Sequence, residues 1–272
     1  MATAKRNRRT GLTPFHALAG GALALFAGGL VILLVSVLSY TDLQAFRAVF
    51  RSADVRFALR LSLMTSTLSA ALAVVFAVPS AYALSRMRFP GRMLADAIVD
   101  IPIVLPPVVL GLCLLVFFRT PLGRAVEQAG FRFVYEPAGI VLAQFLTVCP
   151  YAIRTVKATL DGINPRVEQV ARTLGYGSGR VFILVTLPML KTGILAGGVI
   201  AWAVAFGLFG PMMILVGTTR QRTEVLATSI YLELSVGRIQ SALAIALLMV
   251  GIALGALTAF KALTGVPAPR ER

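Results

Sequence analysis

Residues 167–188, VEQVARTLGYGSGRVFILVTLP, begin as a polar, glycine-punctuated interruption in a chain that is otherwise almost continuously apolar. On each side lies an apolar run of about 20 residues, the length that a helix needs to cross the hydrocarbon core of a bilayer. A polar stretch between two such runs cannot remain in lipid. We therefore interpret it as a loop outside the membrane that joins two spanning helices and serves a soluble partner.

The composition of the whole chain supports the same class of protein. Of its 272 residues, 58% are hydrophobic and only 14% are charged, whereas a soluble domain is about a quarter charged. The net charge of +15 would suggest nucleic acid for a soluble chain. Here the basic residues lie in the breaks between apolar runs, where lipid headgroups are contacted. We expect an all-α polytopic membrane protein that binds lipid and no nucleic acid.

The apolar runs predict six spans and a single transmembrane domain over residues 15–263, between a basic cytoplasmic N-terminus (1–14) and a short cytoplasmic tail (264–272). A cleaved signal peptide is the alternative for the first run, which is long for a signal core and has no prompt A-x-A-like site. The six predicted spans cover about residues 15–38, 57–84, 93–118, 137–155, 192–216 and 239–263.

The distribution of Lys and Arg sets the orientation. They are more numerous in the segments that a cytoplasmic N-terminus places inside, which favours both termini in the cytoplasm. The first outer segment is as basic as the N-terminus, so the bias is modest. The loop at 158–190 is then cytoplasmic.

No motif for catalysis or metal binding is present in the sequence. Lys191-Thr192 lacks the preceding glycine of a phosphate-binding loop, and His16 is the only histidine. Cys113 and Cys149 lie inside apolar runs without the spacing of a disulfide or metal site. We expect neither an enzyme nor a metal site, so energy for any transport comes from a partner or an ion gradient.

The third predicted span is interrupted by prolines. Its sequence ADAIVDIPIVLPPVVLG (95–111) contains Pro102, Pro106 and Pro107, each of which removes a backbone donor. A broken helix is tolerated in a membrane where it is buried or lines a cavity, so these prolines are candidates for a gate. Asp96 and Asp100 precede them on one helical face, and either contribute to the gate or simply pair with Arg92 or Arg88.

The fifth predicted span, TGILAGGVIAWAVAFGLFGPMMILVG (192–217), carries two periodic patterns. A stripe of small residues recurs every four positions and favours close helix packing. An aromatic stripe comprises Trp202, Phe206 and Phe209, and the helix is expected to weaken at Gly207, Gly210 and Pro211. Ordinary packing and an aromatic plug in a passage both remain open. The small stripe consists of Gly193, Gly197, Ala201 and Ala205.

The loop also predicts a short amphipathic helix over 166–174, ended by Gly175, with Leu187-Pro188 marking the stop before the next span. A helix this short is unstable alone and suits insertion into a groove on another protein. Its sequence resembles the EAA signature of permease subunits of ABC importers, E-A-A-x-x-x-G, then nine residues and I-x-L-P. The matching positions are Gln169-Val170-Ala171, Gly175 and Val185-Thr186-Leu187-Pro188, with Gln169 in place of the glutamate, Glu168 beside it, and Val170 in place of an alanine.

The resemblance covers roughly residues 57–263, and the proline-rich third span looks like that of the molybdate and sulfate permeases. It implies a type I importer fold, two permease copies, an ATPase dimer that carries ATP and Mg, and an external binding protein. This chain would then bind no cofactor itself. The implied ATPase-coupling residues are Asp161, Glu168, Gln169, Ala171, Arg172, Leu174 and Gly175.

A small oxyanion is the substrate that the resemblance favours. However, Leu208 stands in the fifth span where such permeases often carry an acidic residue, so ferric iron, polyamine and phosphonate remain alternatives. A gradient-driven transporter is a rival, although that class usually buries ion-coupling residues at mid-depth. A non-transporting membrane scaffold is a second rival, which the two broken spans disfavour.

Overall fold

The computed structural model describes residues 14–264, and all regular secondary structure in that range is helical. The basic N-terminus and the C-terminal tail of the predicted division therefore lie almost entirely outside the described residues. In chain order the helices are α1 (Pro14–Tyr40), α2 (Leu43–Arg51), α3 (Ala53–Arg86), α4 (Arg92–Val104), α5 (Pro107–Arg119), α6 (Pro121–Gln128), α7 (Pro137–Asp161), α8 (Arg166–Thr173), α9 (Ser178–Val181), the π-helix η1 (Phe182–Thr186), α10 (Leu187–Met189), α11 (Lys191–Gly207), α12 (Gly210–Leu215), α13 (Leu226–Ser235) and α14 (Ile239–Thr264).

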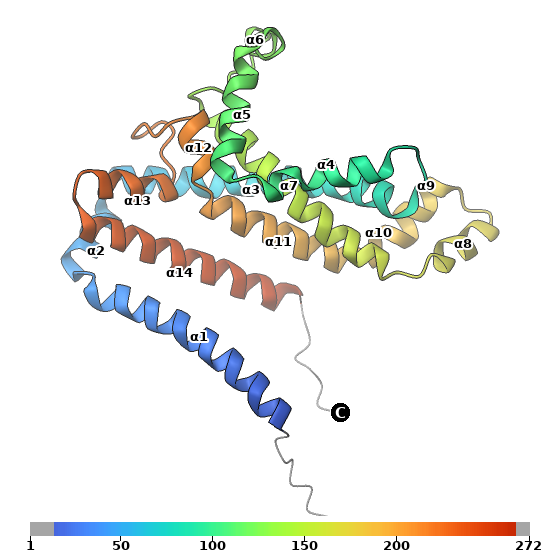
Figure 1. The fold of residues 1–272 in the computed structure, drawn as a ribbon, viewed down its shortest axis with the longest axis horizontal. Helices are drawn as coiled ribbons and strands as arrows, with labels where there is room; N and C mark the ends of the chain where they lie inside the picture. Colours follow the sequence, from blue (N-terminus) through green and yellow to red (C-terminus); the bar gives the residue numbers. More distant parts are fainter. Residues whose placement is uncertain (1–13, 265–272) are drawn as a thin grey trace, which may run out of the picture.

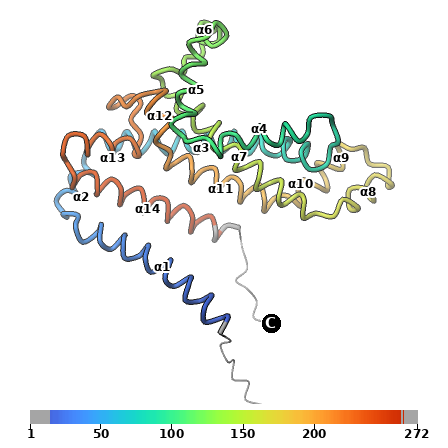
Figure 2. Tube along the Cα trace, in the orientation of Figure 1, coloured from blue at the N-terminus to red at the C-terminus, as the bar shows by residue number. Residues whose placement is uncertain are grey.

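The long helices run along one axis of the molecule. Figure 1 shows α3, α7, α11 and α14 side by side, with α1 diverging beneath α14. One end of the bundle carries α8 and α9, and the opposite end carries α2 and α13 (Figure 2). The loop at 158–190, which the sequence predicts to be cytoplasmic, thus lies at the end away from α2 and α13.

Six spans are present if two bent helix pairs each count as one. Four helices between residues 14 and 264 are long and apolar enough to cross a membrane alone: α1, α3, α7 and α14. The third span is not straight, because α4 and α5 meet at an angle of 110° across residues 105–106. Pro106 and Pro107 lack the amide protons that would continue the helix, so the predicted break is confirmed as a sharp bend.

The fifth span differs from its predicted bounds. The helix of this span, α11, ends at Gly207, and Gly210–Leu215 forms the separate helix α12. At its other end α11 is bent by 67° from residues 178–189, which are helical and precede it directly. Pro188 lies inside that preceding segment and does not stop it, because it stands in the first turn of α10, where a proline is tolerated. The bend itself falls at Leu190.

The core of the bundle is built from small residues that let α3, α7 and α11 approach closely. Ala73, Ala77 and Ala81 on α3 are fully buried, as is the stripe at Gly193, Gly197, Ala201 and Ala205 on α11. A Cβ at Gly197 would stand 3.3 Å from the carbonyl oxygen of Ala152 on α7. The packing role predicted for the small stripe is confirmed.

Three short helices were missed from the sequence: α2 and α13 at one end of the bundle, and α6 at the tip of α5 (Figure 1). Two of them carried a readable start signal. The Asp42 carboxylate accepts a hydrogen bond from the amide of Gln44 at 3.1 Å, and Thr120 caps α6 ahead of Pro121. They were missed because they are short, and a search for apolar runs finds only helices long enough to span a membrane.

Candidate functional site

Helix α8 is the short amphipathic helix that the loop sequence predicted, and Gly175 ends it. The amide of Tyr176 donates to the carbonyl of Ala171, and the amide of Gly175 donates to that of Arg172, which together form a Schellman motif. Gly175 adopts a φ of +90°, in the region that favours glycine. No atom lies within 4 Å of where its Cβ would be, so the glycine is needed for its backbone and not for space.

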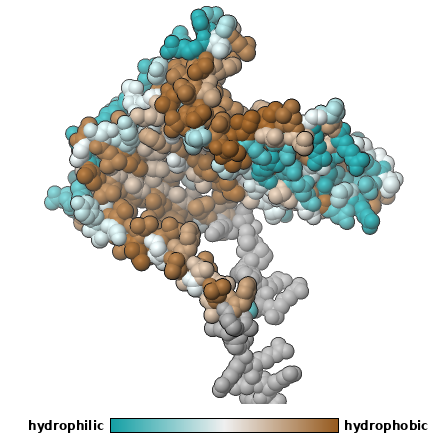
Figure 3. Space-filling view, viewed as in Figure 1, coloured by the Kyte–Doolittle hydropathy of each residue, from teal (hydrophilic) through white to brown (hydrophobic). Residues whose placement is uncertain are grey.

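One face of α8 is apolar and uncovered. Val170 and Leu174 are 59% and 73% exposed, and Val167 beside them is also exposed. Gln169 is exposed as well. Around this face the surface is hydrophilic, as Figure 3 shows for the end of the molecule that carries α8 and α9. An exposed apolar face within a polar surface is typical of a contact with another protein.

The adjoining face of α8 is held by the bundle. Glu168 is 1% exposed and Ala171 is 8% exposed. Nε of Arg86, the last residue of α3, lies 3.1 Å from Oε1 of Glu168. Arg172 also approaches Glu168, at 3.8 Å, and is half exposed. The sequence predicted that Glu168 contacts the ATPase. In the structure Glu168 is buried and pairs with Arg86 of the same chain.

Asp161, the last residue of α7, is likewise paired within the chain. Its carboxylate accepts hydrogen bonds from the hydroxyl of Ser85 and from Nζ of Lys157, the latter at 3.1 Å. Ser85 and Arg86 therefore bind the end of α7 and the start of α8 from the same turn of α3. Of the predicted coupling residues, Gln169 and Leu174 lie on the exposed side, while Glu168 and Ala171 lie against the bundle.

The breaks of the third and fifth spans lie next to each other. A Cβ at Gly210, the first residue of α12, would be 3.0 Å from Cγ2 of Val108 and 3.4 Å from Cβ of Pro107. The structure thus brings Pro107 of the predicted gate together with the Gly210-Pro211 break. Pro106 is exposed and Pro102 is half-buried inside α4.

The aromatic stripe of α11 divides into two parts. Trp202 stacks on Phe206, with ring centroids 5.1 Å apart and planes inclined by 9°, and its indole N–H donates to the hydroxyl of Thr67. Phe206 is 3% exposed and packs inside the core of the chain. Phe209 lies beyond the break, half-buried, with its ring 5.5 Å from that of Tyr231. The three rings therefore do not form one continuous exposed surface.

Asp96 and Asp100 bind Arg154 on α7, and not Arg92 or Arg88 as one of the two sequence interpretations had it. Nη1 of Arg154 lies 2.8 Å from Asp96, and Nε and Nη2 lie 2.6 and 2.5 Å from the two oxygens of Asp100. Because the two aspartates are one turn apart, a single guanidinium reaches both. The sequence could not supply this pairing, since α7 lies 54 residues further along the chain.

Comparison with known proteins identifies the family. Residues 69–264 match the model of the family described as "binding-protein-dependent transport system inner membrane component". The chain belongs to this family. It is therefore an inner-membrane component of a transport system, and the resemblance noted in the loop sequence is confirmed over residues 69–264.

Named relatives and a solved structure agree with this membership. Over 177 residues the chain is 37% identical to the molybdenum transport system permease protein ModB of Escherichia coli (strain K12), covering 64% of this chain and 77% of that one. It is 32% identical over 203 residues to the sulfate transport system permease protein CysT of Salmonella typhimurium (strain LT2), covering 74% and 73%. A crystal structure of a bacterial alginate ABC transporter matches the fold, with a TM-score of 0.74, 19% identity and coverage of 92% and 93%.

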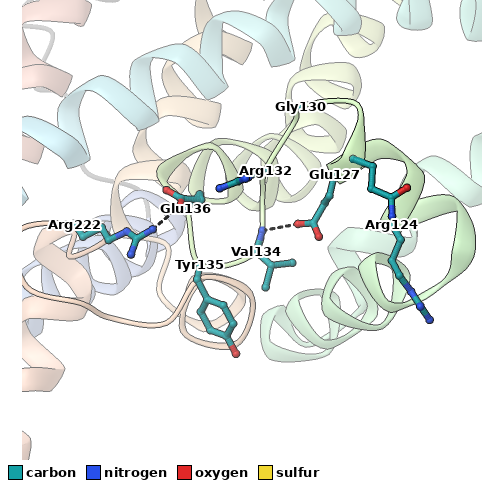
Figure 4. A pocket seen from close by; sticks show the side chains of 9 residues that line it. Arg124, Glu127, Gly130, Arg132, Val134, Tyr135, Glu136 and Arg222 are labelled. Carbon is teal, nitrogen blue, oxygen red and sulfur yellow. Dashed lines mark hydrogen bonds and ion pairs between the residues drawn. The ribbon is translucent and has the colours of Figure 1, made fainter.

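The outer end of this permease-family chain carries a pocket of about 560 Å³ beside α6. Figure 4 shows Glu127 directed toward the backbone amide of Val134, to which it is hydrogen-bonded at 3.2 Å, and Arg222 directed toward Glu136, with which it pairs. Tyr135 between them has a φ of +58°, a strained value for an aromatic residue. These polar contacts fold the 129–136 segment into a fixed outer surface, which the sequence showed only as mixed charge.

Proposed function

We propose that this chain is the membrane-spanning permease subunit of an ATP-driven importer and that α8 couples it to a separate ATPase. The observation that carries the proposal is the exposed apolar face of Val167, Val170 and Leu174 at the end of the bundle. In a membrane protein that end lies in water, where such a face is stable only against another protein. Family membership supports an importer as the setting.

The proposed mechanism uses the ATPase as the source of energy. ATP and Mg bind to the ATPase dimer, and this chain holds no cofactor. The exposed face of α8 enters a groove of the ATPase, as amphipathic helices do in many complexes. Closure of the ATPase dimer draws the α8 helices of two permease copies together, and each bundle rotates as a rigid body between inward-open and outward-open packings.

The proposed passage lies at the paired helix breaks. Pro102, Pro106 and Pro107 on one side and Phe209 on the other are candidates for its wall, because the helix breaks at 105–106 and 208–209 adjoin. Trp202 and Phe206 do not line the passage but support it by packing α11 against the core, in which Phe206 is buried.

For the substrate we propose a small oxyanion of the molybdate or sulfate kind. The support is that relatives with identities of 37% and 32% are named for molybdenum and sulfate transport. An external binding protein would deliver the anion to the outer end, where the pocket beside α6 and the ion-paired 216–238 segment form a polar surface.

The test is reconstitution of the chain in liposomes with its ATPase and binding protein. We expect molybdate or sulfate uptake only when both proteins and ATP are present. Uptake without the ATPase would instead establish a gradient-driven transporter. Within the complete system, Val170→Asp should abolish association with the ATPase, while the matched control Leu122→Asp, at a site 66% exposed on α6 at the other end, should not.

A further inference from the structure

We infer that Arg86 is a positioning residue that joins the coupling helix α8 to α3 and α7, so that the three move together during transport. The inference rests on the proposed ATPase coupling and assigns to Arg86 and Glu168 a role inside the permease and not at its surface.

The contacts of Arg86 are concentrated where three helices meet. Its Nε binds Glu168 on α8 at 3.1 Å, and its Nη2 donates to the carbonyls of Leu160 and Ile163 at 2.9 and 2.7 Å. Those two carbonyls belong to the last turn of α7 and the connection to α8. The guanidinium of Arg86 thus hydrogen-bonds the free carbonyl groups at the end of α7 and also holds the first turn of α8.

The ion pair of Arg86 and Glu168 is buried, which makes it costly to break. The side chains of Arg86 and Glu168 are only 12% and 2% exposed, so water screens the pair little. Separating the pair is costly in free energy, because each buried charge would lose its partner and no water is there to solvate it. Once formed, the pair therefore resists separation when α8 is pulled.

The rest of α8 offers little other attachment to the bundle. Beside Glu168, only Ala171 is buried, and its methyl group contributes a small apolar area. The helix has eight residues, which is too short to be stable on its own. Its connection to η1 follows the glycine-rich turn at 175–179. Beside the short covalent connection from α7 and the packing of α8 on α9 and η1, Arg86 is thus the side chain that links α8 directly to α3 and to the end of α7.

The pair also fixes which face of α8 points outward. Glu168 and Ala171 are three residues apart and face the bundle, and the neighbouring side chains of Val167, Val170 and Leu174 are left exposed beside them. If Glu168 were released, α8 could rotate and still bind a partner, but its displacement would no longer be transmitted faithfully. The expected defect is therefore in coupling and not in docking.

The experiment measures substrate uptake and ATP hydrolysis together in liposomes that hold the complete importer with its binding protein. The variants are Arg86→Gln, Arg86→Lys, Glu168→Gln and the double Arg86→Gln/Glu168→Gln. Arg88→Gln is the matched control, because Arg88 is exposed two residues further on and forms no ion pair within residues 14–264. Co-purification with the ATPase is measured for each.

We expect Arg86→Gln and Glu168→Gln each to lower uptake per ATP hydrolysed by about fivefold or more, with the ATPase still bound. The double variant should be no worse than the worse single one, because both remove the same contact. Arg86→Lys keeps the charge but cannot reach all three acceptors, so it should lie between. Arg88→Gln should match the unaltered protein.

Two results would overturn the inference. Unchanged uptake per ATP in Glu168→Gln or Arg86→Gln would show that the pair transmits nothing. Loss of the ATPase from these variants would place Glu168 in the docking surface. If the unaltered chain itself bound no ATPase, the proposed function would fail, and that outcome is separate because it precedes any substitution.

Discussion

Gly111 on α5 lies against the backbone of Pro211 on α12, and a Cβ on the glycine would stand 2.7 Å from both Cα and the carbonyl oxygen of the proline. The broken halves of two different spans therefore pack main chain to main chain. Such an approach is possible only without a side chain at position 111. It holds the two helix breaks in register with each other.

Replacing Gly111 by valine should force α5 and α12 apart. Overpacking of this kind costs about 1–3 kcal/mol, so we expect a lower thermal unfolding midpoint in detergent and a loss of transport. Gly251→Val in α14 is the control, because no atom lies within 4 Å of its Cβ position. An unchanged midpoint in the Gly111 variant would contradict the packing.

Gly175 should tolerate asparagine better than valine. Its φ of +90° is strained for a β-branched residue by about 1–2 kcal/mol, whereas asparagine enters the left-handed region more readily. We expect Gly175→Val to abolish uptake while the protein remains in the membrane, and Gly175→Asn to retain part of it. Gly179→Val, where φ is ordinary and space is open, serves as the control. Equal loss in all three would indicate a role in direct contact and not in the turn.

Arg154→Gln should loosen α4 from the bundle. No residue of α4 is fully buried, so its attachment relies on the contacts of Asp96 and Asp100 with this arginine. Because the three side chains are partly exposed, we expect a loss of about 1–2 kcal/mol in stability. Limited proteolysis of the 87–106 region and the unfolding midpoint measure it. Arg92→Gln, at a position with no ion pair in the described chain, should have neither effect.

Glu224 should make the outer end less stable as pH rises. Burial raises the pKa of its carboxyl group, despite the hydrogen bond from Ser229 and the nearby Arg220 charge, and its Oε2 has no hydrogen-bond partner. The folded state thus holds a proton that the unfolded state releases first, so stability falls as pH rises from the ordinary glutamate pKa through the raised one. We expect Glu224→Gln to flatten the dependence of the unfolding midpoint over this range. A Glu136→Gln variant, whose carboxylate is ion-paired with Arg222 and does not act on Glu224, should not flatten it.

The sequence predicted the fold well because hydropathy and proline report directly on burial in lipid and on missing amide donors. The six apolar runs correspond to four single helices and two bent helix pairs, and the break at Pro106-Pro107 is one of the bends. The size of a bend is not encoded in this way. It depends on what packs on either side, so the angle of 110° could not be predicted from the residues alone.

The candidate site was predicted in part. The glycine that ends α8 has a local signature, and its position was correct. The inward direction of Glu168 depends on Arg86, which is 82 residues earlier, and the partner of Asp96 and Asp100 is on another helix. Contacts between residues so far apart follow from the packing of α3, α4 and α7, and a single sequence does not contain that packing.

The bends at 105–106 and 208–209 contain no ionisable side chain. A passage between them would present an anion with peptide dipoles and hydrocarbon, and with no countercharge to hold it. Residence there would be brief, and the free-energy profile along the path would be shallow. Such a passage would favour a high transport rate over tight binding. Substrate selectivity would then depend on the protein that delivers the anion.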